Sequence, residues 1–132
     1  MKADTIEIPI SPGEALDKVT ILEIKKEKIR DTAKLKNVSN ELEMLDRILA
    51  VKIKDVAGLK DLRSKLKEVN LRLWKIEDDI RDCEKAKDFG EEFIRLARSV
   101  YFENDSRAKI KKEINILLGS EIVEEKSYQD YS

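Results

Sequence analysis

The stretch 59–83, LKDLRSKLKEVNLRLWKIEDDIRDC, decides the fold. Apolar residues recur along it at alternating steps of three and four. They are Leu59, Leu62, Leu66, Val69, Leu73, Ile76, Ile80 and Cys83. A stripe with this heptad spacing predicts one long helix that packs nearly parallel to its neighbours. The only cysteine of the chain lies on the stripe and cannot form an internal disulfide, so we expect Cys83 to be a small, buried apolar side chain.

The flanking segments predict three more helices. One follows a short loop at 85–90, with Asp88 as its cap, and runs over 91–118 to a left-handed terminator at Gly119. Two precede the stretch, over 12–30 and over 32–54, separated by a cap at Asp31. Because short connections place sequential helices antiparallel, we predict an all-α, antiparallel four-helix bundle. Its third and fourth helices form a hairpin with arms of about 25 residues, roughly 37 Å long.

The two ends of the chain differ from the helices. Isoleucines at 6, 8 and 10 alternate with Glu7 and Pro9, which predicts a short extended arm over 1–10. Ser11 and Glu14 then form a capping box at a helix start. Residues 120–132 form a polar tail. The length of 132 residues suits one helical domain, 1–132.

Composition excludes several classes of protein. Charged residues make up 42% of the chain, yet the net charge is only −1, which argues against a nucleic-acid partner. No apolar run approaches the roughly 20 residues that cross a bilayer, so we expect no membrane insertion. The first residues show no signal-peptide pattern, and we expect a cytoplasmic protein.

The chain has few residues suited to catalysis. It contains no histidine, which removes Ser-His-Asp and Cys-His catalysis and imidazole acid–base chemistry. Carboxylate pairs three residues apart resemble those with which helical nucleotide pyrophosphohydrolases hold magnesium. They are Glu14 and Asp17, Glu43 and Asp46, and Asp79 and Asp82. With 28 acidic residues such pairs arise by chance, and we interpret them as solvated faces. We therefore predict no catalytic residue, no metal site and no cofactor.

A polar stripe beside the apolar one is the most informative feature. It consists of Asn70, Trp74, Glu77, Arg81 and Glu84. In the helix over 91–118, polar residues interrupt the core line at Asn104, Arg107 and Lys111. A hairpin turning near residue 88 would bring these two stripes level with each other. The candidate ligand-binding residues are Asn70, Trp74, Glu77, Arg81, Arg98, Tyr101, Asn104, Asp105, Arg107 and Lys111.

Three interpretations of this polar cluster stay open. The favoured one is a structural network that fixes helix register, with Glu77 or Asp105 pairing the arginines. The second is a pocket for an anionic small molecule, with Arg98, Arg107 and Lys111 as charge partners. The third is a protein-binding face. For the helix start at Ser11 and Glu14, capping alone explains the motif, since first-turn carboxylates repel an anion.

Four segments of the chain resemble a bacterial domain family of unknown function. They are IPISPGEALDKVTILEIK at 8–25, LWKIEDDIR at 73–81, YFENDSR at 101–107 and VEEKSY at 123–128. The resemblance implies a small module found beside glycosyltransferase or tetratricopeptide-type proteins of surface-polysaccharide synthesis. No activity is established for such modules, so the resemblance assigns no functional residues. It also implies that the tail packs back on the bundle.

The sequence thus favours a non-catalytic accessory or adaptor module, homodimeric, with a larger protein partner such as a glycosyltransferase. The glycan association comes from the resemblance alone. The alternative is a small protein that binds a phosphorylated ligand, or a magnesium-dependent nucleotide hydrolase, using the polar cluster between the third and fourth helices.

Overall fold

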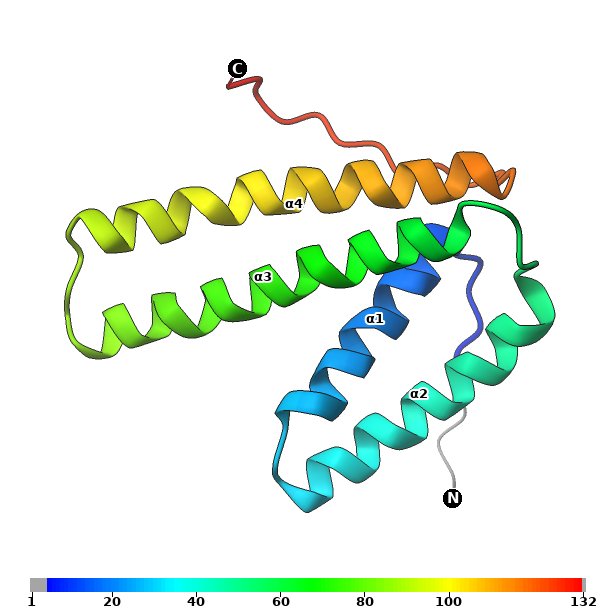
Figure 1. Ribbon diagram of the computed structural model, residues 1–132, viewed down its shortest axis with the longest axis horizontal. Coiled ribbons are helices and arrows are strands. Elements are labelled where there is room, and N and C mark those ends of the chain that lie inside the picture. Colours follow the sequence, from blue (N-terminus) through cyan, green and yellow to red (C-terminus); the bar gives the residue numbers. More distant parts are fainter. Residues whose placement is uncertain (1–4, 132) are drawn as a thin grey trace.

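The computed structural model describes residues 5–131, which form four α-helices and no strand (Figure 1). These are α1 (Pro12–Lys28), α2 (Thr32–Lys52), α3 (Leu59–Lys85) and α4 (Glu91–Leu117). The predicted all-α class and the long hairpin of α3 and α4 are confirmed. Residues 5–10 precede α1 without regular structure. Residues 1–4 of the predicted arm, and the last residue of the tail, lie outside the described part of the chain.

Local sequence signals set most of the helix ends. The Ser11 hydroxyl accepts a hydrogen bond from the Glu14 N–H at 3.2 Å, and α1 begins there. The Asp31 carboxylate caps α2 in the same way. Gly119 takes a left-handed φ of 67° just beyond α4, as predicted for a terminator. The predicted cap at Asp88 is wrong, because Gly90 is the residue that precedes α4, and Asp88 accepts a hydrogen bond from its N–H.

Helix α1 is the central element of the fold. It lies across the hairpin of α3 and α4 and packs against both of those helices and against α2 (Figure 1). Helix α2 packs lengthwise on α1, and only near its C-terminal end, through Leu49, does it reach the apolar cluster that α1 shares with the hairpin. A helix with neighbours on several sides must be buried over more than one stripe. The first half of α1 is accordingly buried almost all round.

Two apolar clusters form the core, and α1 contributes to both. The first joins Leu16 of α1 to buried residues of the hairpin, namely Leu59, Leu66 and Ile114. The second joins α1 to α2, through Val19, Leu22, Val38 and Leu42. The core therefore lies at the end of the hairpin where α3 begins and α4 ends.

The other end of the hairpin extends beyond α1 and α2 (Figure 1). Past Asn70, α3 has no fully buried residue, and the first half of α4 buries only Leu96. The prediction that Cys83 is buried is therefore wrong: the side chain is partly exposed, because no third helix covers this part of the apolar stripe. None of the helices within residues 5–131 combines the length and apolarity needed to span a membrane.

Candidate functional site

A stripe of small and polar residues on α1 faces the hairpin. Gly13, Asp17 and Thr20 recur at helical spacing, and all three are buried. The carboxylate of Asp17 is only 1% exposed. A buried carboxylate must be paired and hydrogen-bonded, or the free energy of folding suffers heavily. The prediction that Asp17 belongs to a solvated face is wrong, because α1 is a central helix and this side of it also packs.

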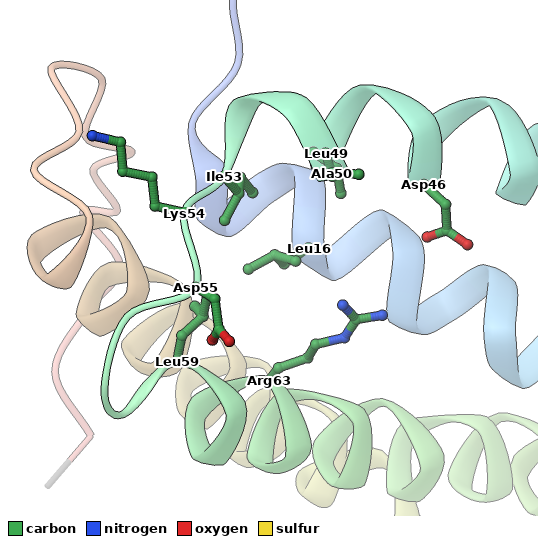
Figure 2. A pocket seen from close by; sticks show the side chains of 9 residues that line it. All are labelled: Leu16, Asp46, Leu49, Ala50, Ile53, Lys54, Asp55, Leu59 and Arg63. Atoms are coloured by element: carbon green, nitrogen blue, oxygen red, sulfur yellow. The ribbon is translucent and has the colours of Figure 1, made fainter.

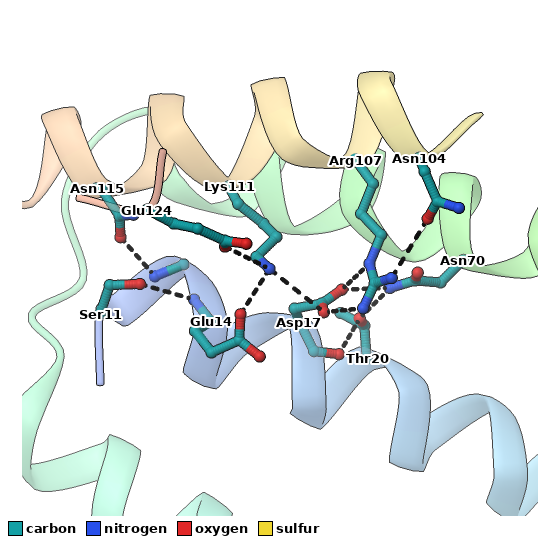
Figure 3. Close-up of polar contacts among 11 residues, drawn as sticks. Ser11, Glu14, Asp17, Thr20, Asn70, Asn104, Arg107, Lys111, Asn115 and Glu124 are labelled. Atoms are coloured by element: carbon teal, nitrogen blue, oxygen red, sulfur yellow. Dashed lines mark hydrogen bonds and ion pairs between the residues drawn. The ribbon is translucent and has the colours of Figure 1, made fainter. Parts of the chain in front are cut away.

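Asp17 is paired with Arg107 of α4 (Figure 3). The Arg107 Nε donates to Oδ1 of Asp17 at 2.9 Å, and the Nη2 donates to Oδ2. On the other side, the Asn70 amide donates to Oδ1 of Asp17 and to the Thr20 hydroxyl, both at 2.9 Å. Hydrogen bonding to Asp17 raises the pKa of Arg107 above its ordinary value, although burial opposes this. One carboxylate thus holds α1, α3 and α4 together.

Lys111 joins the same face of α1 to the tail. Its ammonium contacts the carboxylates of Glu14 at 2.6 Å and Glu124 at 3.2 Å, and lies 3.9 Å from Asp17 (Figure 3). Burial disfavours the charged form, but the hydrogen bonds to Glu14 and Glu124 and the charge of Asp17 outweigh it and raise the pKa of Lys111. Lys111 therefore stays charged although it is only 9% exposed.

The start of α1 is also in close contact with the end of α4. The Gly13 N–H donates to Oδ1 of Asn115 at 2.7 Å. A methyl group at position 13 would lie 2.5 Å from the Lys111 carbonyl oxygen. The Glu14 carboxylate pairs with Lys111, and the absence of a side chain at Gly13 lets α4 approach closely. The interpretation of this motif as capping alone is therefore wrong. The motif SPGE caps the helix and also forms the contact between α1 and α4.

These contacts decide the role of the buried polar residues. Within residues 5–131, every buried side-chain nitrogen and oxygen has a hydrogen-bond partner. The favoured interpretation of a structural network agrees with this finding for Asn70, Arg107 and Lys111. Its predicted partners are wrong, however: Arg107 pairs with Asp17 rather than with Glu77 or Asp105, since α1 covers this part of the hairpin.

A groove borders the network where α1 diverges from the hairpin. Its volume is about 490 Å³. It is lined by Ile21, Ile24, Asn70, Leu73, Trp74, Glu77, Asp78, Arg81, Asn104 and Arg107. We call it the Trp74 groove. Six of the ten predicted ligand-binding residues line it, so the polar stripe of α3 and the interrupted core line of α4 do meet, as the spacing predicts.

The cations of the Trp74 groove are already paired. Arg107 is held by Asp17, as described above, and Arg81 pairs with the Glu77 carboxylate one turn earlier on α3. Asp78 adds a further exposed carboxylate. Counting Asp17 directly behind the lining, three carboxylates face two guanidinium groups. The groove therefore lacks the excess positive charge with which proteins bind phosphate.

The remaining predicted residues lie elsewhere. Lys111 belongs to the network, Arg98 is exposed, and Tyr101 and Asp105 lie beside the tail. There the Tyr131 hydroxyl donates to the Asp105 carboxylate, which raises the pKa of Tyr131 to about 12. The Tyr131 ring also packs against Tyr101 at a centroid distance of 5.2 Å. The tail thus lies back along α4, as the resemblance implied.

The other candidate reactive groups have ordinary surroundings. Glu43 pairs with Arg47 and Asp79 with Lys75, each on its own helix. Partial burial and then the nearby Asp88 raise the pKa of Cys83, which disfavours the thiolate that a nucleophile requires. Across residues 5–131, no three metal-binding side chains of the His, Cys, Asp and Glu types converge.

These features define a class of protein: a small all-α module whose central helix is locked to a long hairpin by a buried ionic network, with an open groove beside it. The chain belongs to DUF6165, a family of unknown function, whose model matches residues 6–131. Neither the curated proteins nor the solved structures contain a match to this chain.

Proposed function

We propose that this protein is a non-catalytic accessory module that binds a segment of a larger protein in the Trp74 groove. The observation that carries the proposal is the composition of the groove. The only tryptophan of the chain lies there among apolar residues, and charged residues surround them. Residues that dominate protein–protein binding energy are enriched in tryptophan and arginine at the centre of an interface, with a polar rim.

The groove has a rigid floor, which favours binding. Asn70 and Arg107 belong to both the groove and the buried network, so their side chains are fixed by Asp17. A preorganised surface loses less conformational entropy when a partner docks. The buried network is then the support of the site, and the Trp74 ring is its principal contact surface.

The charges of the groove indicate the chemistry of the partner. With three carboxylates against two guanidinium groups, and with Glu77 and Asp78 exposed, the groove complements a basic group. A lysine or arginine of the partner can stack on the Trp74 ring and pair with Asp78. We therefore propose a partner segment with a basic residue among apolar ones.

The partner we propose is a glycosyltransferase of surface-glycan synthesis, which this protein would bind in the cytoplasm. This part of the proposal rests on the family resemblance and not on geometry. The protein would act as a homodimer. A dimer offers two grooves, so that two linked sites on one partner bind more tightly than either alone.

A photo-crosslinking amino acid at position 81, an exposed position of the groove that leaves Asp78 in place, tests this proposal when it is introduced in the native host. We expect one larger protein to be captured from position 81 and none from position 41, an exposed site on α2 that serves as control. The captured protein, once purified, should quench the fluorescence of Trp74, and Asp78→Asn should weaken its binding about tenfold. Equal capture from both positions, or unchanged affinity in the variant, would contradict the proposal.

The second candidate is a binder of phosphorylated ligands or a magnesium-dependent nucleotide hydrolase. Two guanidinium groups and two amides in one groove favour it, whereas the pairing of both guanidinium groups disfavours it. Native mass spectrometry of gently purified protein separates the two functions. A mass equal to whole chains favours the accessory module. A bound species of a few hundred daltons, or phosphate release from a nucleotide with magnesium, would replace it with the second candidate.

A further inference from the structure

The turn between α1 and α2 carries a concentrated positive charge. The stretch 25–36, KKEKIRDTAKLK, holds six cations and two carboxylates, whereas the whole chain has a net charge of −1. The rest of the chain is therefore acidic, and the positive charge is gathered at one place. We call this cluster the basic turn. It consists of Lys25, Lys26, Lys28, Arg30, Lys34 and Lys36.

The cations of the basic turn have no partner within the described part of the chain. Across residues 5–131 none of the six side chains forms an ion pair, and all but the partly exposed Lys25 are exposed. Their two acidic neighbours are engaged elsewhere. Glu27 pairs with Lys67 of α3 at 3.0 Å, and the Asp31 carboxylate caps α2 by accepting from the N–H of Lys34. The positive charge is thus open to an external anion.

The opposite end of α2 shows no such excess. A cavity of about 340 Å³ opens there between α1, α2 and α3 (Figure 2). Two cations, Lys54 and Arg63, and two carboxylates, Asp46 and Asp55, line it, and Arg63 is also held by Glu23 at 3.2 Å. Charge is balanced at this end of α2, so the excess belongs to the basic turn alone of the two ends.

Helix stability explains only part of the basic turn. Lys25, Lys26 and Lys28 lie in the last turn of α1, where cations interact favourably with the helix dipole. Lys34 lies in the first turn of α2, where the dipole disfavours a cation and favours a carboxylate, yet this turn has no acidic residue. A lysine that opposes the local electrostatics of its own helix indicates a role outside folding.

The position of the basic turn indicates the shape of its ligand. The turn lies at the edge of the molecule, on the side away from α4 (Figure 1). Cations on a projecting turn suit an extended anionic surface better than a ligand enclosed in a cavity. Five of the six are lysines, which act as compact point charges, whereas arginines bind single phosphates through a bidentate fork. The stretch 25–36 also has no aromatic or amide side chain with which to contact bases.

We propose that the basic turn docks the protein on the surface of an anionic lipid bilayer. Clusters of about four to eight lysines and arginines bind such surfaces by attraction to the headgroups, without insertion. Each cation near the surface strengthens binding about fivefold. The proposal is independent of partner binding in the Trp74 groove, which lies between α1 and the hairpin.

Co-sedimentation of the full chain with lipid vesicles tests the proposal. We expect binding to vesicles of equal parts phosphatidylglycerol and phosphatidylcholine, none to phosphatidylcholine alone, and release as the salt concentration rises. Lys34→Glu should weaken binding at least about tenfold. Its thermal midpoint should stay unchanged or rise, because a carboxylate suits the first turn of α2. A structural role of Lys34 would lower the midpoint instead.

Lys60→Glu is the matched control. Lys60 is also exposed and lies in the first turn of its helix, α3, but it follows the opposite end of α2. The substitution makes the same change in charge at the same helical position, and it should leave vesicle binding close to that of the wild type.

Four outcomes would overturn the proposal. The first is failure to bind anionic vesicles at low salt, and the second is an equal loss of binding in Lys34→Glu and Lys60→Glu. The third is a lower thermal midpoint in Lys34→Glu, which would assign this lysine to folding. The fourth is displacement of the protein from vesicles by an oligonucleotide at equal phosphate concentration, which would reassign the basic turn to nucleic acid.

Discussion

Arg107 on α4 and Asp17 on α1 form an ion pair across 90 positions of sequence, with Nε of the arginine 2.9 Å from Oδ1 of the aspartate; the carboxylate is buried and the guanidinium is half-buried. The amide of Asn70 donates to the same oxygen from α3. Three helices therefore meet at one carboxylate. This contact fixes where α1 crosses the hairpin, and with it the position of the Trp74 groove.

Removal of one member of this pair should destabilise the fold strongly. Arg107→Ala leaves the carboxylate of Asp17 buried without its cation, which costs about 3–5 kcal/mol. The free energy of unfolding in urea, followed by circular dichroism, measures this loss. Lys109→Ala, at an exposed position of the same helix, is the control and should change little. Unchanged stability in Arg107→Ala would instead mark the arginine as a ligand group.

Replacement of both partners tests whether the site requires the ion pair itself or only side chains that fill the volume. Asp17→Leu combined with Arg107→Met removes both charges and keeps apolar volume. Buried ion pairs replaced in this way are often neutral or stabilising. We therefore expect the double variant to be more stable than Arg107→Ala. A double variant as unstable as the sum of its single substitutions would show that the hydrogen bonds to Asn70 dominate.

Gly13→Ala should destabilise the protein although alanine favours helices. The added methyl group would lie 2.5 Å from the Lys111 carbonyl oxygen and 2.9 Å from Oδ1 of Asn115, so α4 must shift. Overpacking of this kind costs about 1–3 kcal/mol, more than the gain in helix propensity. Thermal unfolding measures the effect. Gly90→Ala, whose new methyl group would meet only the flexible Asp88 side chain, is the control.

Lys111 should stabilise the fold up to alkaline pH. Its pKa in the folded protein lies above the ordinary 10.5, so the stabilisation is complete below that pH and declines as the pH rises through the folded value. Lys111→Met should therefore cost about 1–3 kcal/mol at neutral pH, because Glu14 and Glu124 lose their partner. Urea unfolding of both proteins across pH should show the difference shrink above pH 10.5. A constant difference would contradict the ionic contribution.

The tail should stay docked on α4 until the Tyr131 hydroxyl ionises. The hydrogen bond to Asp105 raises the pKa of Tyr131 to about 12, so this contact is fully present below the ordinary value of about 10 and is lost as the pH passes 12. Carbon NMR of the Tyr131 ring measures the midpoint. Asp105→Asn should return the midpoint toward 10. A wild-type midpoint near 10 would mean that the tail is not docked.

Much of the fold follows from local sequence. The heptad stripe over 59–83 predicts α3, Gly119 predicts the end of α4, and Ser11 and Asp31 predict two helix starts. The register of the hairpin was also predictable, because a short loop leaves little freedom: Arg72 contacts Glu103 at 3.0 Å, close to the pairing that a turn near residue 88 implies. For the same reason the polar stripe of α3 was expected to lie level with the polar interruptions of α4, and Asn70 and Arg107 do meet there at Asp17.

The main failures concern α1. Its stripe of Gly13, Asp17 and Thr20 resembles a solvated helix face, and only the polar interruptions of α4 at Arg107 and Lys111 could have suggested a partner for it. The prediction for Cys83 failed in the opposite sense: a residue expected to be buried is partly exposed, because an apolar stripe does not reveal whether a third helix covers it.

The sequence by itself determined the helices, their ends and the hairpin, because hydrogen bonding within a helix, capping and a short loop act over a few residues. The tertiary structure alone decided that α1 crosses the hairpin near α4's end and brings Asp17 to Arg107. That choice depends on which faces can bury charge and volume together, and such pairing across 90 residues has no local signal.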